Sequence, residues 1–129
     1  MQHTLFTITG KVVRGTRLGR KLGFPTANLD RREYSRKKLR IPFGVYAGVA
    51  TISGREKTYR AGIVIGSMDT KGLPKIEAHL LDFSGVLYGK RVYLSLMRYL
   101  RPYKVIKDKA TLKREIANDL KKVRTVVPL

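Results

Sequence analysis

The chain has 129 residues, of which 43% are hydrophobic and 29% are charged, and its formal net charge is +19. This length suits one domain over residues 1–129, and the hydrophobic content is too high for a disordered chain. No apolar run approaches the ~20 residues that span a bilayer, and the N-terminus lacks the pattern of a signal peptide. Because the chain has no cysteine, disulfides and thiolate metal sites are excluded. We therefore expect a cytoplasmic protein.

Short β-branched segments separated by glycine predict a mainly β protein. The expected strands are 5–13, 45–52, 58–65, 75–83 and 92–100. The breaks that divide them lie at 53–54, 66, 72, 84–85 and 89, and each contains glycine. Strands of this length at this spacing predict a closed or nearly closed antiparallel barrel.

The glycine-rich turn after the first strand is a candidate phosphate site. Gly15, Gly19 and Gly23 can adopt positive φ and fold backbone amides around phosphates, although a hairpin turn would explain any one of them. Thr26 and Asn28 are separated by one residue, so in an extended segment both side chains leave on the same side. A hydroxyl and an amide oxygen there suit a hard cation such as Mg²⁺, whereas turn formation by the Asn is the alternative.

Three residues after Asn28 begins the strongly basic segment 31–40, where RNA binding would first be sought. Such a run is more often a solvated loop. No regularly spaced aromatic platform for stacking bases accompanies it. A basic nucleic-acid-binding barrel therefore remains an alternative without a motif of its own.

Glu77 lies in the apolar predicted strand 75–83. Strand alternation places Glu77 and His79 on one face and Ile76, Ala78 and Leu80 on the other. An isolated strand Glu is usually a solvent-side residue, and His79 is read as a supporting hydrogen-bonding residue. Only a combination with Thr26 and Asn28 favours a functional role for Glu77.

The C-terminal segment after Pro102 predicts an amphipathic helix packed against the barrel. Apolar residues recur at helical spacing, and lysine and arginine lie on the opposite side. The apolar residues are Leu112, Ile116, Leu120 and Val123. Asp108 or Thr111 is the expected N-cap.

Several motifs, in order and spacing, resemble the riboflavin kinase (flavokinase) family of bacteria and eukaryotes over nearly the whole chain. They are Gly-x-x-x-x-Gly-x-x-x-Gly-Arg-x-x-Gly-Phe-Pro-Thr-Ala-Asn (10–28), Gly-Val-Tyr (44–46), Ile-Glu-Ala-His-Leu-Leu-Asp-Phe (76–83), Leu-Tyr-Gly (87–89) and Tyr-Leu-Arg-Pro (99–102). The resemblance implies a six-stranded Greek-key antiparallel β-barrel with a C-terminal α-helix. It also implies transfer of the γ-phosphoryl group of Mg-ATP to the 5′-hydroxyl of riboflavin, which gives FMN.

The resemblance further implies a role for individual residues. Glu77 is the implied general base, and Thr26 and Asn28 are the implied Mg²⁺ ligands. The implied nucleotide-binding residues are Gly15, Gly19, Arg20, Gly23, Thr26 and Asn28, and Arg101 is implied in flavin binding. The expected partners are riboflavin and ATP, with no membrane partner, and we expect a monomer.

The chain departs from the family pattern in two segments. Residues 64–70 read Val-Ile-Gly-Ser-Met-Asp-Thr where many members have Asn-Ile-Gly-x-Arg-Pro-Thr, and residues 103–106 read Tyr-Lys-Val-Ile. Both changes put the flavin-side contacts in doubt, so a non-catalytic flavin- or nucleotide-binding barrel is a further alternative. Many relatives also carry an adenylyltransferase domain, for which this chain has no room, so FAD synthesis is expected to need another protein.

Overall fold

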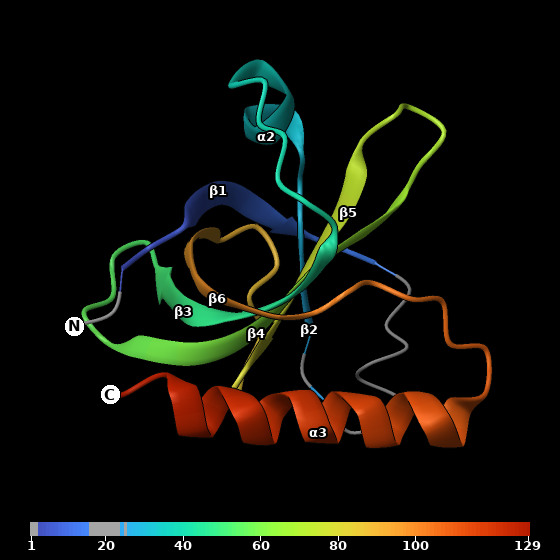
Figure 1. Cartoon of the computed structure of the whole chain (residues 1–129). Coiled ribbons are helices and arrows are strands. Elements are labelled where there is room, and N and C mark those ends of the chain that lie inside the picture. Colours follow the sequence, from blue (N-terminus) through green and yellow to red (C-terminus); the bar gives the residue numbers. More distant parts are fainter. Residues whose placement is uncertain (1–2, 16–23, 25) are drawn as a thin grey trace.

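Six antiparallel strands close into a barrel in the computed structural model, which describes residues 3–15, 24 and 26–129 (Figure 1). The strands are β1 (Phe6–Val13), β2 (Thr26–Leu29), β3 (Gly44–Ile52), β4 (Thr58–Met68), β5 (Pro74–Leu80) and β6 (Arg91–Arg101), and the helices are α2 (Arg32–Arg36) and α3 (Lys109–Val126). Around the barrel the order is β1-β2-β5-β4-β3-β6. Because β6 returns to lie beside β3 after the β3-β4-β5 meander, the topology is a Greek key, and the expected fold class is confirmed.

The barrel interior holds the main hydrophobic core. Strand alternation sends one side chain in two inward, and these are mostly Ile, Val, Leu and Ala, for example Ile8, Ile63 and Leu94. The rings of Phe6 and Tyr46 meet edge to face, with their centroids 6.1 Å apart. The outer face of the barrel is therefore left free to carry polar side chains and to receive a helix.

Two strand boundaries differ from the prediction by more than one residue. A break was predicted at Gly66, but β4 continues through it to Met68. A side chain at residue 66 would overlap the ring of Tyr103, so this glycine permits close packing inside a strand and does not form a turn. Strand β5 ends at Leu80, before the predicted end at residue 83, because Asp82 takes a φ of 60° and turns the chain.

Segment 31–40 contains the short helix α2, which the sequence analysis did not predict. Its Tyr34 is buried, and the phenol oxygen accepts a hydrogen bond of 3.0 Å from the backbone N–H of Ile41. Arg31 donates to the carbonyl of Pro74 at 2.9 Å and forms an ion pair with Asp69. These contacts hold α2 beside the tip of the β4–β5 hairpin, at the side of the barrel opposite α3 (Figure 1).

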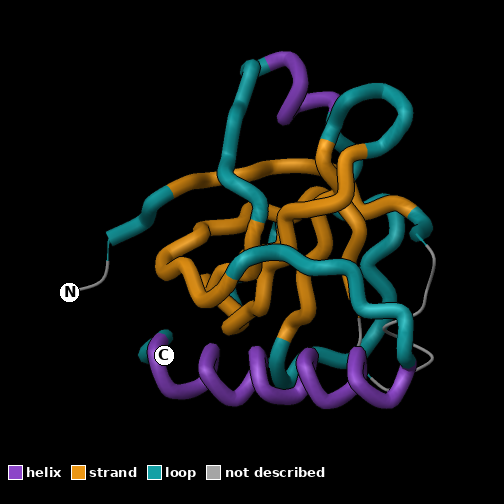
Figure 2. Tube along the Cα trace, turned by 45° about the vertical axis from the view of Figure 1, so that its right-hand side comes forward, coloured by secondary structure: helices purple, strands orange, loops and turns teal. Residues whose placement is uncertain are grey.

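Helix α3 runs across the outer face of the barrel (Figures 1 and 2). Asp108 is its N-cap and accepts a hydrogen bond of 2.9 Å from the backbone N–H of Thr111, so the first of the two expected caps is confirmed. The C-terminal half packs through the fully buried Val123 and Val127 against a second apolar cluster on the barrel surface. No helix among the described residues is long and apolar enough to cross a membrane.

Candidate active site

The pairing of β2 with β5 brings four predicted polar side chains together. Asn28 lies directly opposite Glu77, and Thr26 lies directly opposite His79. Direct cross-strand partners have Cβ atoms about 5 Å apart, and all four side chains leave on the outer face. The predicted alternation is confirmed, because Ile76, Ala78 and Leu80 point into the core instead.

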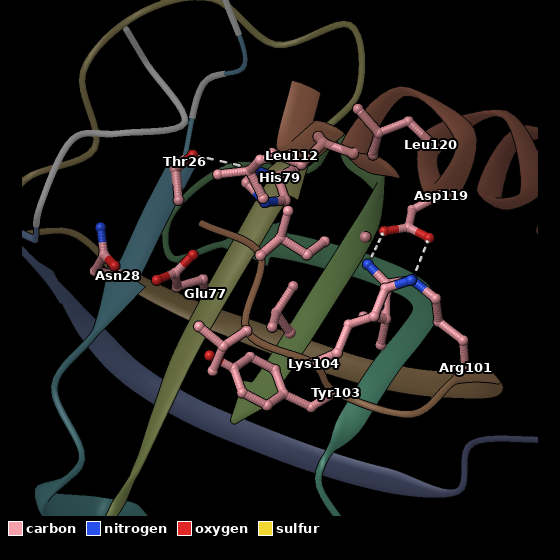
Figure 3. A pocket seen from close by; sticks show the side chains of 16 residues that line it. Thr26, Asn28, Glu77, His79, Arg101, Tyr103, Lys104, Leu112, Asp119 and Leu120 are labelled. Carbon is pink, nitrogen blue, oxygen red and sulfur yellow. Dashed lines mark hydrogen bonds and ion pairs between the residues drawn. The ribbon is translucent and has the colours of Figure 1, made fainter. Parts of the chain in front are cut away.

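A cavity of about 210 Å³ lies between this outer face and α3 (Figure 3). Its walls are mostly apolar and include Val64 from β4 and Ile116 from α3. Thr26, Asn28 and Glu77 all line it. Apolar walls with a few polar groups at one end are typical of small-molecule sites.

Glu77 is held in a partly desolvated position in this cavity. Burial raises the pKa of its carboxyl, and the charge of Lys75 offsets the shift only in part. A carboxylate with a raised pKa is a stronger proton acceptor than one in water. The environment of Glu77 thus suits general-base chemistry.

The oxygen atoms of Thr26, Asn28 and Glu77 form a donor set for a hard cation. Among the described residues no group of three His, Cys, Asp or Glu side chains could hold a metal ion on its own. A magnesium ion at neutral ligands such as Thr26 and Asn28 would be bound weakly and would be shared with the oxygens of a bound phosphate. The residues present fit a metal that arrives with a nucleotide.

Gly15 is the one predicted phosphate-loop glycine among the described residues. A Cβ atom at this position would overlap the amide group of Asn28, so any larger residue would require that side chain to move. Gly19, Arg20 and Gly23 lie outside the described residues. Their predicted contacts with phosphate stay predictions.

Two further cavities share lining residues with the first. One, of about 140 Å³, shares Thr26 and is lined by the rings of Phe83 and Tyr88. The other, of about 170 Å³, shares Asn28 and Glu77 and is lined by basic residues including Arg14. The guanidinium of Arg14 in the latter lies 5.1 Å from the centre of the Tyr88 ring in the former.

Arg101 lines the main cavity at the end near α3, where its charge is already paired. Its Nε and Nη2 atoms each donate to the carboxylate of Asp119 at 2.9 Å, and Nη1 donates to the carbonyl of Pro102 at 3.1 Å. Asp119 is only 5% exposed, and the pair holds the pKa of Arg101 above its ordinary value. The guanidinium therefore joins β6 to α3, and its predicted contact with a flavin stays a prediction.

Sequence reasoning missed two residues of this region. Asp119 stands among the apolar positions of α3, three residues after Ile116, and an acid at a buried helix position requires a cationic partner. Arg14 directly precedes Gly15, and its position beside the loop could have been noted. The segment of Tyr103 was named as divergent, but the packing of its ring against Gly66 joins segments far apart in the sequence and had no local signal.

Comparison with known proteins gives a consistent result. A family model described as riboflavin kinase (Flavokinase) matches residues 2–127. The chain is 38% identical over 117 residues to the bifunctional riboflavin kinase/FMN adenylyltransferase of Escherichia coli K12, covering 88% of this chain and 36% of that protein. It is 34% identical over 117 residues to the RNA-binding riboflavin kinase RibR of Bacillus subtilis, covering 88% of this chain and 47% of that protein.

Two solved structures share the fold. The riboflavin kinase of Trypanosoma brucei superposes with a TM-score of 0.67 at 25% identity, covering 97% of this chain and 80% of that one. A protein titled macrolide-efflux protein from Streptococcus pneumoniae superposes with a TM-score of 0.78 at 27% identity, covering 94% of this chain and 39% of that one. The chain thus spans less than half the length of the two curated relatives named above.

Proposed function

Because this chain belongs to the riboflavin kinase family, we propose that it transfers the γ-phosphoryl group of Mg-ATP to the 5′-hydroxyl of riboflavin and so produces FMN. The observation that carries the proposal is that Thr26, Asn28 and Glu77, which the β2–β5 pairing brings together, line the main cavity, while Thr26 also lines the second cavity and Asn28 and Glu77 also line the third. Phosphoryl transfer needs two substrates and a cation at one point, and residues that face more than one cavity would serve that need. The family match does not favour the two non-kinase alternatives.

The main cavity is our proposed site for the flavin ring. Its volume of about 210 Å³ is below the ~300 Å³ at which ordinary ligand pockets begin, so the walls must move apart when the ring enters. All four residues of the divergent segment 103–106 line it. Within the other divergent segment, 64–70, Val64 alone lines this cavity, so we expect segment 103–106 to determine flavin affinity.

The two adjoining cavities are our proposed nucleotide site. The aromatic cavity with Phe83 and Tyr88 suits a purine ring. The phosphates would then pass Arg14 and Gly15 toward Thr26 and Asn28, where backbone amides and positive charge can surround them. Magnesium, held by Thr26 and Asn28, would supply further charge neutralisation on the phosphates.

Glu77 is our proposed general base. Its carboxylate would accept the proton of the ribityl 5′-hydroxyl as that oxygen attacks the γ-phosphorus, and ADP leaves from the opposite side. The mostly apolar walls of the cavity would limit the access of water to the reacting groups. Arg101 and Asp119 would fix the distance between β6 and α3 and so the width of the flavin site.

The direct test mixes the pure protein with riboflavin, magnesium and each of the four nucleoside triphosphates, followed by chromatography for FMN. We expect FMN with ATP.

Asn28→Ala should raise the KM for Mg-ATP, whereas Glu77→Gln should lower kcat and leave riboflavin affinity nearly unchanged. Unchanged kinetics in both variants would contradict the site. Flavin binding without any single-turnover product would favour a non-catalytic barrel, and salt-dependent RNA binding without FMN would favour a nucleic-acid-binding one.

We also retain three proposals about the protein as a whole: one domain over residues 1–129, a monomeric state and a cytoplasmic location. Size-exclusion chromatography with light scattering tests the second of these. A mass near 14.7 kDa is the expected result. A mass twice as large would contradict it.

A further inference from the structure

His79 is the one side chain of the polar group on β2 and β5 that the proposed reaction leaves without a role. It is 6% exposed, and its Nδ1 atom lies 3.0 Å from Oγ1 of Thr26 across the β2–β5 pairing. Figure 3 shows the two side chains joined by this hydrogen bond beside Asn28 and Glu77. His79 is therefore hydrogen-bonded directly to Thr26, a proposed cation ligand.

The second hydrogen bond of Thr26 decides the direction of the first. Its hydroxyl lies 3.1 Å from the carbonyl oxygen of Phe24, which can only accept a hydrogen bond. A hydroxyl has one hydrogen, so when it donates to Phe24 the Nδ1 atom of His79 must be the donor. This assignment satisfies all three groups, and it follows from the network of partners.

The consequence lies in the lone pairs of Oγ1. One lone pair accepts from His79, the hydrogen points to Phe24, and the second lone pair remains for another partner. A hydroxyl that rotated freely could instead turn its hydrogen toward a cation and repel it. Two fixed partners prevent that rotation.

We propose that His79 is a positioning residue for the cation site, which acts by donating from Nδ1 to Thr26 and thereby directing a hydroxyl lone pair toward the magnesium ion. The inference rests on the proposed function, because it takes Thr26 as a ligand of the nucleotide-bound metal. Partners of metal ligands typically change metal affinity 10- to 100-fold when removed. His79 itself contacts neither the metal nor the reacting atoms.

The test compares His79→Asn with His79→Ala. The amide nitrogen of Asn is attached to Cγ, as Nδ1 of His is, so Asn can keep the donor while Ala removes it. Calorimetry would measure ADP binding with and without magnesium. We expect the gain in ADP affinity on adding magnesium to fall roughly 10- to 100-fold in His79→Ala and to recover most of that loss in His79→Asn. Thermal melts confirm that both variants are folded.

A second variant separates a positioning role from a structural one. Thr26→Val keeps the shape of the side chain and removes the hydroxyl. If His79 acts through that hydroxyl, His79→Ala causes no additional loss of the magnesium effect in the Thr26→Val protein. An equal loss in both backgrounds, or an Asn variant as weak as the Ala variant, overturns the proposal.

Measurements of ADP binding and of FMN formation distinguish this inference from the proposed function. Magnesium-dependent ADP binding without FMN formation would remove the proposed function and leave the role of His79 intact. ADP binding that is the same with and without magnesium would remove both. FMN formation combined with a His79→Ala variant that keeps the full magnesium effect would remove only the role of His79.

Discussion

Glu77 is placed where its chemistry and the stability of the fold conflict. Because burial raises the pKa of the carboxyl in the folded state, the charged form is less favourable there than in the unfolded chain. The stability that Glu77 contributes is therefore present below the pKa of the unfolded state and is lost as pH rises through the higher folded-state pKa. The ionised carboxylate therefore destabilises the fold, and the proposed general-base role requires that ionised form.

Glu77→Gln should therefore be more stable and less active than the wild type. At pH 7 we expect the free energy of unfolding to rise by roughly 0.5–2 kcal/mol, while kcat falls ~10²–10⁴-fold. Urea denaturation at pH 7 and pH 4 checks the first part, and the stability difference should shrink at the lower pH because the wild-type carboxyl becomes neutral. A variant that is less stable than the wild type at pH 7 would contradict this explanation.

Gly15→Ala should damage the nucleotide site through Asn28. The added methyl group would displace the Asn28 amide, so we expect the KM for Mg-ATP to rise about tenfold or more while riboflavin binding is retained. Gly54→Ala is the matched control, since Gly54 lies in a turn with a φ of 80° and far from the site. It should lower stability without changing the KM, and equal effects of the two variants on the KM would contradict the prediction.

At the scale of residues, the sequence predicted which side chains share a face but not which ones pair. Strand alternation around Glu77 and the two-residue spacing of Thr26 and Asn28 are local properties, and the structure brings these residues together. The partner of Arg101 could not be identified, because its contact with Asp119 depends on where α3 crosses the barrel. The pairing of Tyr103 with Gly66 depends on the same packing.

At the scale of elements, α3 is held to the barrel by contacts of unequal strength. Side-chain exposure is 18% and 8% for Arg101 and Asp119, against 49% and 63% for Arg124 and Asp82. Removing one partner of a buried pair leaves the other charge without compensation, whereas exposed pairs contribute little. The first pair should therefore dominate the attachment of the helix.

Asp119→Ala should cost about 3–5 kcal/mol of unfolding free energy, because Arg101 stays desolvated and keeps only its longer ion pair of 3.8 Å with Glu115. Asp82→Asn, which keeps a residue tolerant of positive φ, should cost far less, because its ion pair with Arg124 is exposed. Arg101→Met combined with Asp119→Leu should regain most of the first loss. Urea denaturation measures all three, and comparable losses for the two single variants would show that the burial of the pair does not matter.

Element boundaries were predicted well where local chemistry decides them and badly where packing decides them. The turn at Gly54 and the cap at Asp108 are local features, and both are present. Strand β4 passes through Gly66 because a distant aromatic ring fills the space beside it. Helix α2 has only five residues, and the burial of Tyr34 in the core holds it in place. A helix this short leaves no periodic pattern in the sequence that could indicate it.

At the scale of the whole molecule, the acidic residues are almost all engaged within the fold. The chain has nine acids against 28 lysines and arginines. Those held in ion pairs are Asp30, Glu33, Asp69, Asp82, Glu115 and Asp119. Asp108 caps α3 and Glu77 is in the cavity. The excess positive charge is thus displayed on the surface with little to offset it, and self-repulsion opposes the folded state.

The melting temperature should therefore rise with ionic strength. Between about 20 mM and 300 mM NaCl the Debye length falls from roughly 20 Å to below 8 Å, which screens repulsion between distant surface cations. Lys113→Glu, an exposed change on α3, should raise the melting temperature at low salt and weaken its dependence on salt. Calorimetry checks both, and a melting temperature that falls as salt is added would show that the ion pairs outweigh the repulsion.

The pairing of β2 with β5 has a consequence for biosynthesis. Thr26 and His79 are 53 positions apart, and Asn28 and Glu77 are joined by the same strand pairing. A nascent chain that leaves the ribosome presents Thr26 and Asn28 well before Glu77 has been synthesised. The proposed site therefore forms only when β2 pairs with β5, and a fragment that stops short of β5 should show no kinase activity.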